Sequence, residues 1–128
     1  MEREMIGYIT VGTNKFEEAA EFYDALLGTL GAGRAFDADT FIAWSTGPKS
    51  PAISIAKPFD GAAATVGNGV MIAIAMDTPE KVDAFYAKAL ELGGTDEGAP
   101  GKRGDNFYAG YFRDLDGNKL NAFCFVSK

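Results

Sequence analysis

The chain has 128 residues, of which 47% are hydrophobic and 23% are charged, a balance typical of a globular domain with a buried core. Its net charge of −6 argues against nucleic-acid binding, which needs a basic surface, and it also disfavours contact with anionic membranes. No apolar run approaches the length of a membrane span. We therefore expect neither a nucleic acid nor a membrane among its partners.

Two features of the composition limit the chemistry further. The chain has no histidine, which excludes a histidine general base and every metal site built on imidazole. Its single cysteine, Cys124, cannot form a disulfide within the chain, so a reducing, cytoplasmic location is expected. Any catalysis has to use carboxylates, tyrosines, lysines, the thiol or backbone groups.

The first half of the chain predicts a strand, a helix and three short strands. Phe22 and Leu26 keep the spacing of a buried helix face. Asn14 is the expected N-cap of this helix, with Glu17 three residues later as in a capping box, and Gly31 is its expected stop. The strands of this half are expected at 5–12, 34–37, 40–45 and 51–57.

The second half of the chain predicts the same order of elements. A stretch rich in glycine and alanine, 58–68, reads as the connection between the halves. Asp77 is the expected N-cap of the second helix, Pro79 fits its first turn, and Gly93-Gly94 ends it. The strands of this half are expected at 69–76, 95–98, 106–113 and 119–126.

The two halves also correspond in sequence when the chain is shifted by 63 residues. The pair Phe22-Tyr23 then falls on Phe85-Tyr86. Further matches are Ile9 with Ile72, Val11 with Ile74, Glu17 with Glu80, and Gly31 with Gly94. Because these positions are the ones that shape strands and helix ends, we expect one βαβββ unit used twice, at about 1–57 and 69–128.

The sequence resembles the glyoxalase/bleomycin-resistance/dioxygenase superfamily, also called vicinal oxygen chelate proteins, over essentially its whole length. The most specific shared pieces are the Phe-Tyr pair in each helix and the turn segment 111–120, Tyr-Phe-Arg-Asp-Leu-Asp-Gly-Asn-Lys-Leu. The resemblance implies an α+β fold of two βαβββ modules whose strands form a U-shaped half-barrel around a small-molecule ligand. It also implies a homodimer and, in metal-dependent members, a divalent ion held by two ligands from each module.

The four metal-ligand positions implied by the resemblance carry no histidine or carboxylate here. Tyr8 stands at the first-strand position and Met71 at its counterpart in the second module. Ser54 lies near the position on the last strand of the first module, and Asn121 replaces the glutamate. Divalent cations prefer several charged oxygen or nitrogen ligands. We therefore expect no metal and no other cofactor.

Alternation along the strands predicts, without the resemblance, which side chains face a ligand, because successive side chains point to opposite faces of a sheet. The parity places Cys124 on the helix side, as a buried inert thiol. The set expected to face the ligand combines apolar walls with a few neutral polar groups, which suits a small organic molecule. It consists of Tyr8, Thr10, Ser54, Met71, Ala73, Asn121, Phe123 and Phe125.

Four of the candidate residues each have a second interpretation. Tyr8 is either a proton donor or an aromatic wall with a satisfied hydroxyl, and Asn121 is either a ligand-facing hydrogen bonder or a structural amide. Trp44 and Tyr111 are candidates for stacking on a ligand, with packing in the core or in a dimer interface as the alternative.

Charged residues near the expected pocket mouth are further candidates. Arg103 and Lys102 lie in a Gly-rich segment and could clasp a carboxylate, as could Lys57, although a solvated loop is the alternative. Asp114 and Asp116 look like a carboxylate pair, but in an Asp-x-Asp-Gly-Asn turn we expect them to bond their own backbone.

Three functions remain open from the sequence. The first is a metal-independent protein that binds a small organic ligand in the half-barrel pocket. The second is a lyase or isomerase of the lactoylglutathione-lyase type, whose family chemistry uses a metal and a glutamate base, or a metal-free enzyme in which Tyr8 and Asn121 stabilise an oxyanion. The third is a non-catalytic subunit or interaction module.

Overall fold

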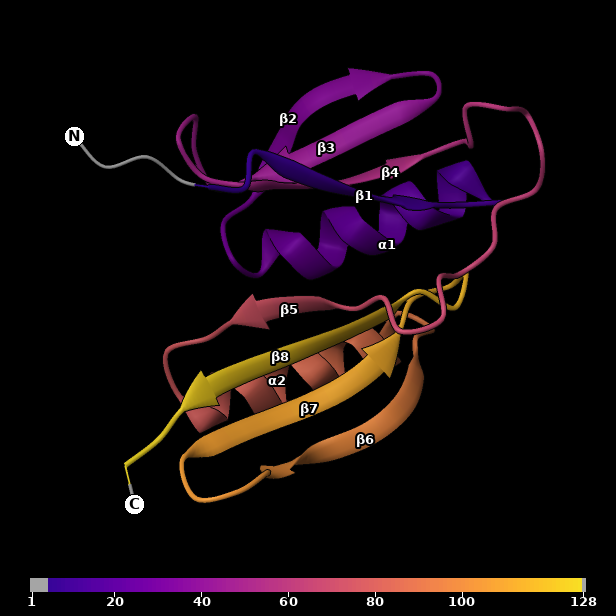
Figure 1. Ribbon diagram of the computed structural model, residues 1–128. Helices are drawn as coiled ribbons and strands as arrows, with labels where there is room; N and C mark the ends of the chain where they lie inside the picture. The colour runs from indigo at the N-terminus through magenta and orange to yellow at the C-terminus, as the bar shows by residue number, and fades with distance from the viewer. Residues whose placement is uncertain (1–4, 128) are drawn as a thin grey trace. The chain divides into compact units, whose positions relative to one another are not determined.

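The computed structural model describes residues 5–127. The chain forms two compact units that divide between Val66 and Gly67 (Figure 1). Each unit contains one helix and four strands in the order βαβββ, so the predicted α+β class and the predicted order of elements are confirmed. Within residues 5–127, neither helix is long and apolar enough to cross a membrane.

The first module forms a mixed four-stranded sheet with one helix. Its sheet has the order β1-β4-β3-β2, in which β1 runs parallel to β4 and the other neighbours are antiparallel. The parallel pair is possible because the intervening elements supply the long connection that parallel strands need. The elements are β1 (Tyr8–Gly12), α1 (Phe16–Gly28), β2 (Gly33–Ala38), β3 (Phe41–Ser45) and β4 (Ala52–Ala56).

The second module repeats this topology. Its sheet has the order β5-β8-β7-β6, with β5 parallel to β8 and the other neighbours antiparallel. The identical strand order in both modules supports the internal duplication seen in the sequence. The elements are β5 (Ile72–Ala75), α2 (Pro79–Glu91), β6 (Thr95–Lys102), β7 (Phe107–Arg113) and β8 (Lys119–Phe125).

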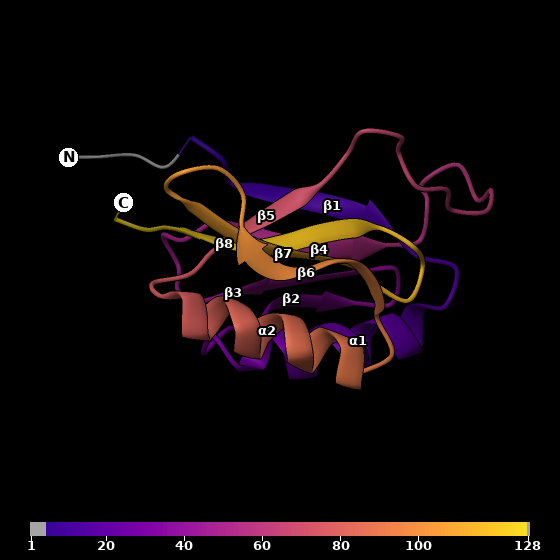
Figure 2. The same cartoon turned by 90° about the horizontal axis from the view of Figure 1, so that it is seen from below.

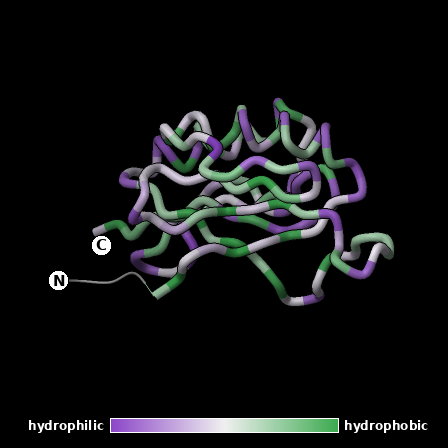
Figure 3. The backbone as a smooth tube through the Cα atoms, turned by 90° about the horizontal axis from the view of Figure 1, so that it is seen from above, coloured by the Kyte–Doolittle hydropathy of each residue, from purple (hydrophilic) through white to green (hydrophobic). Residues whose placement is uncertain are grey.

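Each helix covers one face of the sheet in its own module. α1 packs on β2, β3 and β4, and α2 packs on β6, β7 and β8 (Figures 1 and 2). Both helices alternate hydrophobic and hydrophilic residues along their turns (Figure 3), as expected for helices with one buried face. Tyr23 and Leu26 of α1 and Val82 of α2 are completely buried, and burial of a side chain of this size stabilises the fold by about 1.5–3 kcal/mol.

The predicted N-caps of both helices were wrong. Thr78, not Asp77, caps α2, because its Oγ1 accepts a hydrogen bond from the backbone N–H of Lys81 at 3.2 Å. The N-cap residue of α1 is Lys15, not Asn14. The side chain of Asn14 binds the backbone of Ala64, where Oδ1 accepts from the N–H at 2.7 Å and Nδ2 donates to the carbonyl at 2.9 Å. A partner fifty residues away cannot be read from local spacing.

β6 extends further than the sequence predicted. It was expected at 95–98 but continues to Lys102, through most of the Gly-rich segment interpreted as a loop. Pro100 is tolerated there because β6 is an edge strand, and its register shifts on both sides of Gly98. Gly110 of β7 permits this arrangement, since a Cβ at Gly110 would lie 2.9 Å from Cγ of Pro100.

The turn between β7 and β8 is built around the buried carboxylate of Asp114. Its Oδ1 accepts hydrogen bonds from the backbone N–H groups of Asp116 and Asn118, both at 2.9 Å. Its Oδ2 accepts from Nδ2 of Asn118 at 3.0 Å. The structural role predicted for Asp114 is therefore confirmed.

We expect the substitution Asp114→Ala to lower the free energy of unfolding by about 2–4 kcal/mol, because it leaves several donors of a buried turn without an acceptor. Urea denaturation followed by circular dichroism measures the effect. Asp39→Ala is the matched control, since Asp39 is exposed in another turn. Equal stability of the two variants would contradict the structural role of Asp114.

Candidate functional site

Each sheet has one face that its module's own helix does not cover, which we call the open face. In the first module, Trp44 lies on the helix side and contacts Tyr23 of α1. The register aligns Thr10 of β1 with Ser54 of β4 and Ala43 of β3, so these three side chains share the open face. The face predicted for Thr10 and Ser54 from alternation in the sequence, opposite to the helix, is the face on which they lie.

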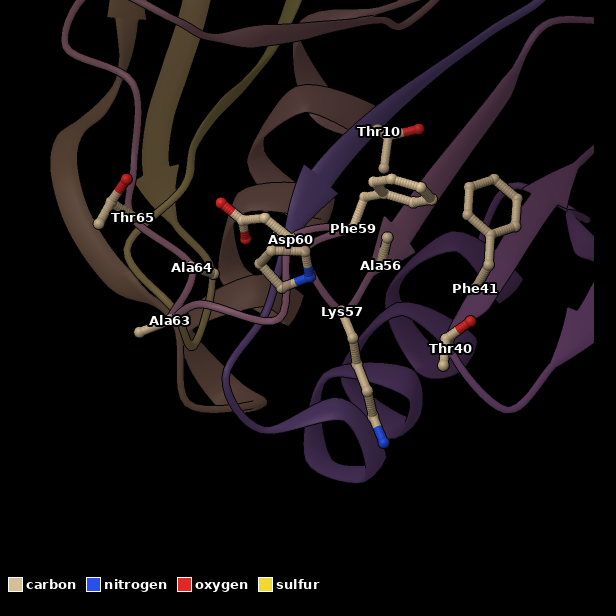
Figure 4. Close-up of a pocket in the computed structure, with 12 residues that line it drawn as sticks. Thr10, Thr40, Phe41, Ala56, Lys57, Phe59, Asp60, Ala63, Ala64 and Thr65 are labelled. Atoms are coloured by element: carbon tan, nitrogen blue, oxygen red, sulfur yellow. The ribbon is translucent and has the colours of Figure 1, made fainter.

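A cavity of about 730 Å³ lies on the open face of the first module, at the end where β1 and β4 finish (Figure 4). Its volume is within the range of small-molecule pockets. Part of its wall comes from the strands and part from the segment that follows β4, which the sequence suggested only as a connection. The lining residues are Thr10, Gly12, Thr40, Phe41, Ala56, Lys57, Pro58, Phe59, Asp60, Ala63, Ala64 and Thr65.

The segment after β4 is held against β1 by specific contacts. Ala64 is bound through both backbone groups to Asn14, as described above. A Cβ at Gly12 would lie 2.9 Å from Cβ of Ala64, so only glycine permits this close approach. Asp60 Oδ1 accepts from the N–H of Ala62 at 2.9 Å and closes a local turn. The cavity wall is therefore built onto the first module.

Aromatic side chains dominate the apolar part of the cavity. The ring of Phe41 makes edge-to-face contacts with Tyr8, at 6.0 Å between centroids, and with Phe36, at 5.9 Å. Phe59 is fully exposed and adds a second aromatic side chain (Figure 4). Tyr8 is 64% exposed, so its ring is accessible on this face.

Two charged side chains, Lys57 and Asp60, line the cavity. Lys57 extends away from Thr10 and Phe59 in Figure 4, and its Nζ lies 5.5 Å from the ring centroid of Phe16. Asp60 is the carboxylate among the lining residues. The interior surface is thus mostly apolar with a few polar groups, which suits a small organic molecule.

The open face of the second module has an aromatic end. Phe107 stacks on Phe123, with centroids 5.5 Å apart and an interplanar angle of 22°. Phe125 meets both rings, at 5.6 Å from Phe107 and 5.8 Å from Phe123. This placement of Phe123 and Phe125 agrees with the alternation in the sequence.

The other end of this face carries Tyr111 with two cations. Cζ of Arg103 and Nζ of Lys119 each lie 5.5 Å from the centroid of the Tyr111 ring. Lys102, the other cation of the Gly-rich segment, aligns with Tyr108 and therefore lies on the helix side of the sheet, not on the open face. Arg103 and Tyr111 were among the predicted site residues and Lys119 was not, although alternation from Asn121 places Lys119 on this face.

Trp44 is a core residue, not a ligand-facing one. It is 1% exposed, and its Nε1 donates a hydrogen bond to Oδ1 of Asp24 at 2.8 Å. Core packing, the alternative considered for Trp44, is therefore the role that the structure shows. The hydrogen bonds from Arg34, more than the one from Trp44, hold the pKa of Asp24 below its ordinary value.

Ser54 and Asn121 present buried polar atoms on the two open faces. Ser54 is 0% exposed and Asn121 is 2% exposed. Within residues 5–127, neither Oγ of Ser54 nor Oδ1 of Asn121 has a hydrogen-bond partner. An unsatisfied buried polar atom costs about 1–3 kcal/mol, so a donor that reached either oxygen would recover that cost.

Two further candidates lie near or behind the second sheet. Met71 is 40% exposed and directly precedes β5. Cys124 is buried on the helix side, where burial raises the pKa of its thiol. A thiol held in its protonated form is a poor nucleophile, in agreement with the inert role expected for Cys124.

A comparison with protein families gives a match over residues 5–122 to the family described as the Glyoxalase/Bleomycin resistance protein/Dioxygenase superfamily. The chain belongs to this superfamily. A comparison with curated proteins finds no match.

Solved structures of superfamily members have the same fold. A glyoxalase/bleomycin resistance protein from Albidiferax ferrireducens is 40% identical, with a TM-score of 0.85 over 94% of this chain and 98% of that chain. A family enzyme from Burkholderia phytofirmans is 19% identical, with a TM-score of 0.78 over 94% and 98% of the two chains. Lactoylglutathione lyase from Agrobacterium tumefaciens is 15% identical, with a TM-score of 0.72 over 96% and 95%. The last two likenesses concern the fold alone.

The residues at the superfamily's implied metal positions do not fit a divalent ion. In the first module Tyr8 and Ser54 offer a phenol and a hydroxyl, and in the second Met71 and Asn121 offer a thioether and an amide. Magnesium, calcium and zinc sites in proteins are built mainly from carboxylates, imidazoles and thiolates. In the part of the chain that the structure describes, no group of three or more acidic or cysteine side chains is arranged to hold a metal.

Proposed function

We propose that this superfamily member binds a small organic ligand on the open faces of its sheets without a metal. The observation that carries the proposal is the cavity of about 730 Å³ in the first module, with Phe41 and Phe59 as aromatic walls and Thr10 as a neutral polar group. Such a surface desolvates an apolar ligand and orients it through few hydrogen bonds.

The proposal extends to the other residues that the sequence singled out. Ser54 on the first open face offers its unpartnered oxygen to a ligand donor, and Asn121 does so on the second. Met71 and Phe123 are proposed as apolar contacts. The superfamily name, which includes bleomycin resistance, is consistent with members that bind small molecules.

We expect Phe41→Ala to weaken binding of a neutral dimethylaminonaphthalene dye about tenfold, because it removes an aromatic wall of the cavity. Fluorescence titration measures the affinity. Phe36→Ala is the matched control, since Phe36 is an exposed phenylalanine on the same face but does not line the cavity. Failure of the wild type to bind the dye, or equal weakening by both variants, would count against the proposed pocket.

We expect the purified protein to retain far less than one equivalent of zinc or nickel after incubation and dialysis, because the implied ligand positions lack charged donors. Elemental analysis measures the metal, and an assay with a glutathione hemithioacetal measures lyase turnover. Stoichiometric metal together with turnover would overturn the proposal and favour a lactoylglutathione-lyase-like enzyme. Turnover without metal would favour the metal-free lyase or isomerase.

We also propose that the protein is a cytoplasmic homodimer. Exposed apolar side chains on the open faces, such as Tyr8, Phe36 and Phe125, are of the kind that often marks an interface. The free thiol of Cys124 agrees with a reducing compartment. Light scattering is expected to give twice the mass of one chain, and the mass of a single chain would refute the dimer.

A further inference from the structure

Strand β8 presents a row of side chains whose chemistry changes from one end to the other. Alternate residues point to the same face of a strand and are about 7 Å apart, so the open face of the second module carries this row in sequence order. A cation comes first, a neutral amide follows and two aromatic rings complete the row. The members are Lys119, Asn121, Phe123 and Phe125.

A second cation joins the charged end of this row. Cζ of Arg103 and Nζ of Lys119 each lie 5.5 Å from the centroid of the Tyr111 ring. Arg103 approaches the ring from the β6 side, next to Gly98, and Lys119 approaches from β8 on the other side of β7. Arg103 is held there, because its Nη2 donates to the carbonyl of Ala99 at 2.8 Å. The strand beneath it has no side chain at Gly101, where a Cβ would lie 3.1 Å from Nη1.

Among residues 5–127, neither Arg103 nor Lys119 forms an ion pair with a carboxylate. The ion pairs in the described part of the chain use Arg34, Lys81, Lys88 and Arg113. Arg113 lies nearby on β7 and pairs with Glu97 at 3.4 Å, which shows that paired cations occur on the same sheet. In a protein of net charge −6, two cations near one ring, with no ion-pair partner among residues 5–127, favour an anion from outside the chain.

The amide of Asn121 adds a requirement beyond charge. Asn121 aligns with Tyr111 across β8 and β7, so the two side chains lie side by side on the open face. Oδ1 of Asn121 is buried without a hydrogen-bond partner within residues 5–127. An anion alone cannot satisfy this acceptor, which needs an O–H or N–H group.

We propose that the open face of the second module binds an organic acid that carries a hydroxyl or amide N–H beside its carboxylate. The carboxylate pairs with Lys119, and Arg103 adds positive potential from the other side of the Tyr111 ring. The neighbouring donor binds Oδ1 of Asn121, and the apolar body packs on Phe123 and Phe107. This site rests on the proposed ligand binding at the open faces, but all its residues belong to the second module and none lines the cavity of the first.

Phenyllactate is a suitable probe because it combines a carboxylate, an adjacent hydroxyl and an aromatic ring. Calorimetry is expected to show saturable binding, about tenfold weaker for phenylpropionate, which lacks the hydroxyl, and for phenyllactamide, which lacks the charge. Backbone amide shifts of Tyr111, Asn121 and Phe123 locate the site. No saturable binding of phenyllactate, or equal competition by inorganic phosphate, would overturn the proposal.

Lys119→Gln is expected to weaken phenyllactate binding about tenfold and Arg103→Gln about threefold, and both are expected to reduce its dependence on salt. Lys102→Gln is the matched control, because it removes the same charge one residue from Arg103 but at the opposite strand parity. The proposal fails if Lys102→Gln has the same effect as Arg103→Gln. Retention of dye binding by these variants separates failure here from failure of the first-module pocket.

Asn121→Leu is expected to abolish the preference for phenyllactate over phenylpropionate while leaving the affinity for phenylpropionate nearly unchanged. Circular dichroism verifies that the variant is folded. Should Asn121→Leu not fold, the comparison of the two acids with the wild type and with Arg103→Gln still decides, because the hydroxyl preference must persist when only the charge contact is lost. A preference that survives in folded Asn121→Leu would refute the role of the amide.

Discussion

One helix cannot cover both faces of a four-stranded sheet, and this constraint organises each module. Strand alternation divides the side chains between a face that must be apolar to bury the helix and a face free to carry other chemistry. Trp44 and Phe112 lie fully buried in the cores of their modules. Ser54 and Asn121, on strands that also contribute to those cores, take the other face. The candidate binding surfaces are thus formed by alternate side chains of the strands whose other side chains pack against the helix.

Local sequence patterns were sufficient for the order of elements, since period and punctuation depend on neighbouring residues. Such patterns predicted the duplication and the faces of the sheets on which Ser54 and Phe123 lie. They also predicted the end of α1 at Gly31, whose φ of 82° is one that glycine adopts easily. Predictions failed where a side chain has a distant partner. Asn14 has the composition of an N-cap, but its amide binds Ala64. Trp44 gives no local sign of the hydrogen bond that it donates to Asp24.

The candidate site was less predictable than the fold. Because the segment around Pro100 is rich in glycine, it was predicted to be a loop, whereas it is part of the edge strand β6. The position of Arg103 beside Tyr111 follows from that strand and could not be predicted without it. Phe59 belongs to a segment with no strand or helix pattern, so nothing in its sequence indicated a cavity wall. By contrast, the neutral character of Ser54 and Asn121 was evident at once, because it depends on residue type and not on position in space.

The binding of Ala64 by Asn14 changes how the join between the two modules is understood. Residues up to Ala64 belong mechanically to the first module, and β5 begins at Ile72. The tether is therefore only the seven residues 65–71, with a maximum reach of roughly 25 Å. Extra residues inserted before Ala64 would reshape the cavity wall, whereas residues inserted after Val66 would lengthen the tether. Circular permutants or fusions are accordingly best opened in that short second stretch.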